Sequence, residues 1–140
     1  MMRTHAIPCV SRAVLLAALV ILTLIGRKFI GDPVGAAADS NIVLNSPLAV
    51  TNMRASFGAF PLGCALFVFV CLLTSSLRTT GLAFVALIVG TALSVRIFGI
   101  VADGTLAESL RLVVAESVLL VLSLGAYAGE WLNNSVIRRA

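Results

Sequence analysis

Three charged residues stand inside long apolar stretches of this sequence: Arg54, Arg96 and Glu116. At 1.5 Å per residue, each lies about 9 to 16 Å inside the end of its predicted helix. An ionisable group at a membrane-helix centre costs roughly 2.5 to 3.5 kcal/mol on insertion scales. We therefore expect all three side chains to face the interior of a helix bundle and to meet there. Guanidinium groups in such a place bind carboxylates or phosphates.

Asn52 and Asp103 complete this candidate site. Arg54 is predicted to pair with Glu116, with Asn52 supplying a further hydrogen bond. The second arginine, Arg96, leaves a surplus positive charge that Asp103 could neutralise from the following loop. If it does not, the pocket is electropositive and suits an anionic headgroup or a carboxylate. The alternative is a structural clamp, in which an Arg–Glu pair only fixes helix register; both hypotheses stay open.

Other catalytic or metal chemistry lacks the necessary residues. His5 is the only histidine, and Cys9, Cys64 and Cys71 show no metal-binding spacing. There is no glycine-rich phosphate loop and no nucleophile elbow. We therefore predict no catalytic residue, no metal and no bound cofactor, although a lone Glu116 in an apolar site could move protons.

The composition is that of a membrane protein. Of 140 residues, 60% are hydrophobic and only 11% are charged, and the mean hydropathy is +1.10. Soluble domains average about 25% charged residues. The net charge of +4 does not indicate nucleic-acid binding, because the basic residues form no face and are not interleaved with aromatics.

The apolar pattern predicts an all-α, integral membrane four-helix bundle. Ser46 followed by Pro47 marks a helix start, Asp103–Gly104 marks a turn, and Pro61 is expected to kink the second helix. The predicted helices cover about residues 13–30, 47–77, 80–102 and 106–129, within a transmembrane domain 13–129 flanked by cytoplasmic tails 1–12 and 130–140.

The first apolar segment is short. Its uncharged part, 13–26, has 14 residues, against roughly 20 needed to cross a bilayer. Flanking arginine and lysine side chains can lengthen the span by reaching the interfaces. A cleaved signal peptide is the alternative, but the candidate cleavage site lies far beyond the apolar run. We favour a retained helix.

Basic residues also predict orientation, because positive charges concentrate in cytoplasmic loops. Most of them fall on one side of the predicted bundle, namely Arg3, Arg12, Arg78, Arg138 and Arg139. Arg27 and Lys28 fall on the other side, with most of the acidic residues. Both termini are therefore predicted to be cytoplasmic.

The stretches "NMRASFGAFPLGCALF" and "VRIFGIVADG", followed by a helix-4 glutamate, resemble the domain-of-unknown-function 4345 family of small bacterial membrane proteins with four predicted helices. The layout is more distantly similar to DoxX-like proteins. The resemblance covers roughly residues 46–125, with Ala59 standing where the family usually has a second glycine. It implies the four-helix architecture, a bacterial plasma (inner) membrane location and the choice of site residues, but no activity. The family positions map onto Asn52, Arg54, Phe57, Arg96, Asp103, Gly104 and Glu116.

Three functions are compatible with these observations. The first is binding of a small anionic ligand or lipid headgroup in an outer-leaflet polar pocket. The second is a membrane enzyme or redox accessory subunit that uses Glu116 as a proton donor. The third is a purely structural subunit. The sequence favours binding or structure over enzymatic activity, with the lipid bilayer as the implied partner.

Overall fold

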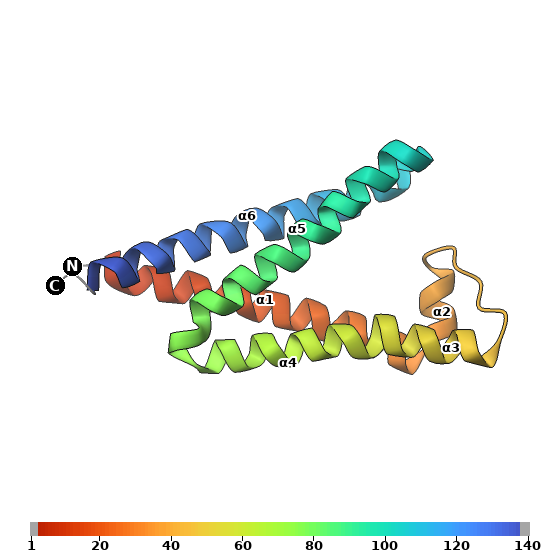
Figure 1. Cartoon of the computed structure of the whole chain (residues 1–140), viewed down its shortest axis with the longest axis horizontal. Helices are drawn as coiled ribbons and strands as arrows, with labels where there is room; N and C mark the ends of the chain where they lie inside the picture. The colour runs from red at the N-terminus through yellow and green to blue at the C-terminus, as the bar shows by residue number, and fades with distance from the viewer. Residues whose placement is uncertain (1–2, 138–140) are drawn as a thin grey trace. The chain divides into compact units, whose positions relative to one another are not determined.

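The computed structural model describes residues 3–137, which are almost wholly helical (Figure 1). Arg138 and Arg139 lie outside the described residues, as do the side chains of Arg3 and His5. Four helical segments are long and apolar enough to cross a membrane, and this confirms the predicted all-α, four-span architecture. They are Ile7–Gly31, Pro47–Leu73, Ser75–Asp103 and Leu106–Asn133.

The helix bounds differ from the predicted ones mainly at the ends. The second span ends at Leu73, and a short 3-10 turn then leads directly into the third. The first and last helices extend through most of the predicted tails. In chain order the elements are α1 (Arg3–Gly31), α2 (Pro33–Ala38), α3 (Pro47–Met53), η1 (Arg54–Ala59), α4 (Phe60–Leu73), η2 (Ser75–Leu77), α5 (Arg78–Asp103) and α6 (Leu106–Ile137).

The chain forms two compact units. One comprises the residues up to Leu16 together with those from Cys71 onward, and the other comprises Ala17–Val70. In the first unit α5 and α6 run alongside each other as an antiparallel hairpin (Figure 1). The predicted turn is confirmed: Gly104 has a left-handed backbone with φ +71°, and its N–H donates to the Ile100 carbonyl at 3.0 Å.

Small residues let helices of the first unit approach closely. A Cβ atom at Gly81 would lie 2.6 Å from Cys71 Cβ and 3.2 Å from Leu15 Cδ2. Leu15, Cys71 and Leu82 are fully buried. The beginning of α1, the end of α4 and the beginning of α5 therefore meet at this point, and Cys71 acts as a small packing residue.

In the second unit, α1 packs against η1 and the start of α4. A Cβ atom at Gly26 would lie 2.8 Å from the Gly58 carbonyl oxygen, and one at Gly58 would lie 2.6 Å from Ile30 Cγ1. The rings of Phe29 and Phe57 lie 5.4 Å apart beside this crossing. The glycine that follows Arg54 by one turn thus admits the α1 helix.

The second span contains a π-helical turn where the sequence predicted a proline effect. Pro61 has no N–H, and its ring crowds the carbonyl of Phe57 in a regular α-helix. In η1 the hydrogen bonding widens instead, and the Phe60 N–H donates to the carbonyl of Ala55, five residues earlier. The local start of this span is as predicted, with Ser46 Oγ accepting from the Ala49 N–H at 3.1 Å.

The close crossing predicts that Gly26→Ala destabilises the protein. The new methyl group would meet the Gly58 carbonyl and Leu62 Cγ at 2.6 Å, and overpacking of this kind costs about 1–3 kcal/mol. Thermal unfolding in detergent measures the effect. Gly63→Ala is the matched control, because a Cβ atom there meets nothing within 4 Å. Equal stability of the two variants would contradict the packing described here.

Candidate functional site

Arg96 and Glu116 form a two-point ion pair across the α5–α6 hairpin. Arg96 Nε donates to Glu116 Oε2 at 2.9 Å, and Nη2 donates to Oε1 at 2.6 Å. The two side chains are 29% and 20% exposed. Such paired, charge-assisted bonds combine energy with fixed geometry. The structure therefore brings together two of the three charged residues singled out in the sequence.

A second Arg–Glu pair lies at the other end of the same hairpin. Arg78 Nη1 is 3.6 Å from Glu130 Oε1, and the side chains are only 12% and 6% exposed. Glu130 Oε1 is buried with no hydrogen-bond partner, so its compensation comes from the nearby guanidinium charge. The sequence analysis missed this pair, because Arg78 was assigned to topology and position 130 to the C-terminal tail.

Helical spacing contains the signal that would have found the second pair. Arg78 and Arg96 are 18 residues apart, which is five whole helical turns, so they share one face of α5. Glu116 and Glu130 are 14 residues apart, close to four turns, on one face of α6. Two arginines facing two glutamates across an antiparallel turn form two matching pairs.

Arg54 makes a different kind of contact. Its Nε donates to the backbone carbonyl of Ile30 at 3.3 Å, in the last turn of α1. Carbonyl groups in the last turn of a helix have no partner within the helix and carry its negative partial charge. Arg54 therefore caps the end of α1 within the second unit, whereas Arg96 and Glu116 belong to the first unit. The predicted convergence of the three charges stays a prediction.

Asn52 and Asp103, the remaining predicted site residues, are both exposed. Asn52 lies on α3, two residues before Arg54, and Asp103 is the last residue of α5. Within residues 3–137, neither side chain has a hydrogen bond or ion pair to the other candidate residues. Among the described residues, no group of three or more His, Cys, Asp or Glu side chains could hold a metal ion.

A protein-family model described as "Domain of unknown function (DUF4345)" matches residues 10–127. The chain belongs to this family. No curated protein and no solved structure matches the chain. The DUF4345 match includes Arg54, Arg96 and Glu116 together with the Asp103–Gly104 turn, and it ends before Glu130.

The buried pair predicts a large effect of removing Arg78. Arg78→Ala would leave the Glu130 carboxylate buried without its cation, a change that costs about 3–5 kcal/mol in buried ion pairs. Thermal or denaturant unfolding in detergent measures this loss. Glu130→Gln in the same background should restore part of the stability, because it removes the uncompensated charge.

The control for this prediction is Arg111→Ala, which removes an equal charge from an exposed position of α6. It should change stability by no more than about 0.5 kcal/mol. The burial argument is wrong if Arg78→Ala is as mild as Arg111→Ala.

Proposed function

We propose that this DUF4345 member is a four-span membrane protein that binds a small anion or an anionic lipid headgroup through Arg54. The observation that supports the proposal is the nature of the Arg54 contact. Among the described residues, its guanidinium bonds only to a backbone carbonyl and pairs with no carboxylate. The two terminal nitrogens remain available for a forked contact with a phosphate or carboxylate.

The position of Arg54 makes an uncompensated charge costly. Arg54 lies within the span Pro47–Leu73, about 10 Å along the helix from its first residue. The end of α1 offers only about half of one elementary charge. A bound anion would supply the rest, and intramembrane ionisable residues are by default candidates for function. Arg96 differs, because a full carboxylate already holds it.

The contacts argue for a structural role of the Arg96–Glu116 pair in this proposal. Both carboxylate oxygens of Glu116 accept from the guanidinium, so neither is free to act on a substrate. This weakens the alternative of an enzyme or redox accessory subunit with Glu116 as proton donor. A purely structural protein would account for the ion pairs of the hairpin, but it would leave Arg54 without a reason.

The larger pocket remains part of the proposal. In it, Arg54 joins Arg96 and Glu116, while Asn52 and Asp103 contribute from its edge. We further propose a bacterial plasma (inner) membrane location with both termini cytoplasmic. An even number of spans places both ends on one side, and the excess of basic residues near the ends supports the cytoplasmic side.

Arg54→Gln tests the proposed function. Glutamine keeps an N–H donor for the Ile30 carbonyl but removes the charge. The probe is phosphatidylglycerol, titrated into the purified full chain in a neutral detergent, and the readout is the thermal unfolding midpoint. We expect phosphatidylglycerol to stabilise the wild type and to have a several-fold weaker effect on the variant, because a charge-assisted bond is lost.

Two controls make this result specific. Arg111→Gln removes one positive charge from an exposed position of α6 and should leave the lipid effect unchanged. Inorganic phosphate, added in place of the lipid, separates a headgroup site from a site for a free anion. Equal stabilisation of wild type and Arg54→Gln by both probes would refute the proposal.

A further inference from the structure

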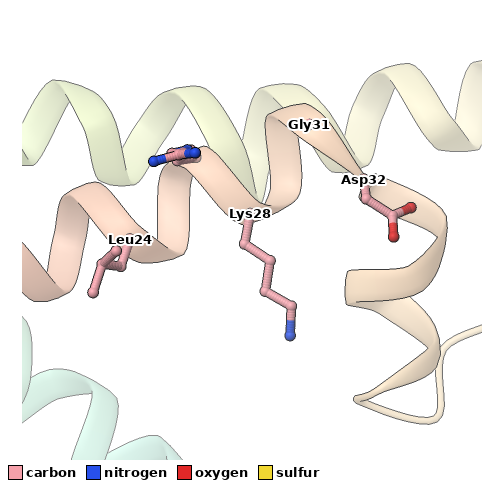
Figure 2. A pocket seen from close by; sticks show the side chains of 5 residues that line it. Leu24, Lys28, Gly31 and Asp32 are labelled. Atoms are coloured by element: carbon pink, nitrogen blue, oxygen red, sulfur yellow. The ribbon is translucent and has the colours of Figure 1, made fainter.

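A hollow of about 340 Å³ lies on the surface at the end of α1, away from the Arg54 contact. Figure 2 shows the Leu24 and Lys28 side chains on one side of the α1 ribbon, with Asp32 at the turn into α2. The lining residues are Leu24, Arg27, Lys28, Gly31 and Asp32.

Helix geometry places this hollow opposite the packed face of α1. At 100° per residue, Gly26 and Ile30, which meet Gly58, stand on one side of the helix. Leu24, Arg27 and Gly31 stand on the other side. The hollow is therefore not filled by the packing of α1 against η1, and Arg54 does not line it.

The charges in the hollow are unequally committed. Lys28 Nζ contacts Asp39 Oδ2 at 2.6 Å, so that cation is already neutralised. Asp32 Oδ1 accepts the Gly35 N–H at 2.9 Å as the N-cap of α2, which leaves its other oxygen available. Arg27 has no ion pair among the described residues. One free cation and one free carboxylate oxygen therefore remain, with no net charge between them.

We propose that this hollow binds the headgroup of a zwitterionic aminophospholipid, with the lipid phosphate on Arg27 and the ammonium group on Asp32. The balanced pair of free charges matches a headgroup that also carries one of each sign. The membrane level fits as well, because the first span ends at Gly31. Leu24 is 59% exposed and lies about 10 Å deeper along the helix, where an acyl chain would pass.

The chemistry distinguishes this headgroup from the other common ones. The primary ammonium of phosphatidylethanolamine donates hydrogen bonds to a carboxylate, whereas the quaternary ammonium of phosphatidylcholine has no N–H to donate. Phosphatidylglycerol carries a phosphate but no cation, so it would leave the Asp32 carboxylate facing a negatively charged lipid. A preference for phosphatidylethanolamine over both is the signature of the proposed site.

The test uses the purified full chain in neutral detergent, with each of the three lipids titrated separately. The half-saturating lipid fraction is read from the thermal unfolding midpoint and from lipid retained in native mass spectrometry. We expect half-saturation at about a tenfold lower fraction of phosphatidylethanolamine than of phosphatidylcholine, as one charge-assisted hydrogen bond would give.

Two variants separate the proposed contacts. Asp32→Asn keeps a side-chain oxygen for capping α2, since asparagine is as good an N-cap as aspartate, and it should abolish the preference for phosphatidylethanolamine over phosphatidylcholine. Arg27→Gln should weaken both lipids alike, because both carry the phosphate. Asp103→Asn and Arg111→Gln are charge-matched controls at exposed positions outside the hollow and should change neither result.

Three results would overturn the proposal. They are equal binding of phosphatidylethanolamine and phosphatidylcholine by the wild type, a preference that survives Asp32→Asn, and tighter binding of phosphatidylglycerol that depends on Arg27. Arg54→Gln should leave the phosphatidylethanolamine preference intact, so this site and the anion site proposed above stand or fall separately.

Discussion

The pairing of arginine with glutamate between α5 and α6 is the interaction on which the hairpin depends, because an ionised side chain in hydrocarbon needs an opposite charge. The arginines are separated by about 27 Å along α5 and the glutamates by about 21 Å along α6. The length of the side chains takes up the difference. Sliding one helix by a turn, about 5.4 Å, would separate both pairs at once. The charges thus fix a register that apolar side chains in lipid specify only weakly.

A different constraint shapes the second unit. There, backbone approaches backbone at Gly26 and Gly58, and the π-helical turn before Pro61 restores hydrogen bonding that proline would otherwise remove. Arg54 begins this widened turn and reaches the end of α1. π-helical turns inside α-helices are frequent at functional sites. One unit therefore neutralises its intramembrane charges internally, whereas the other holds an arginine against a carbonyl and keeps its charge available.

Local signals in the sequence predicted much of this fold. Apolar length gave the four spans, and the Ser46–Pro47 and Asp103–Gly104 pairs marked a helix start and a turn. Register between helices was harder, because it depends on residues far apart in the chain. Glu130 was missed when the fourth helix was ended at residue 129, although its spacing from Glu116 matches that of the two arginines. The Ile30 carbonyl that receives Arg54 left no signal at all, since every residue carries such a group.

Charge exchange across the hairpin tests the central claim most directly. Arg96→Glu and Glu116→Arg should each destabilise the protein strongly, because each places two like charges together in the membrane. The double variant R96E/E116R restores opposite charges, and its thermal unfolding midpoint in detergent should recover most of the loss. Contacting residues show coupling of about 0.5–3 kcal/mol. If the effects of the two single changes simply add in the double variant, these charges do not hold α5 against α6.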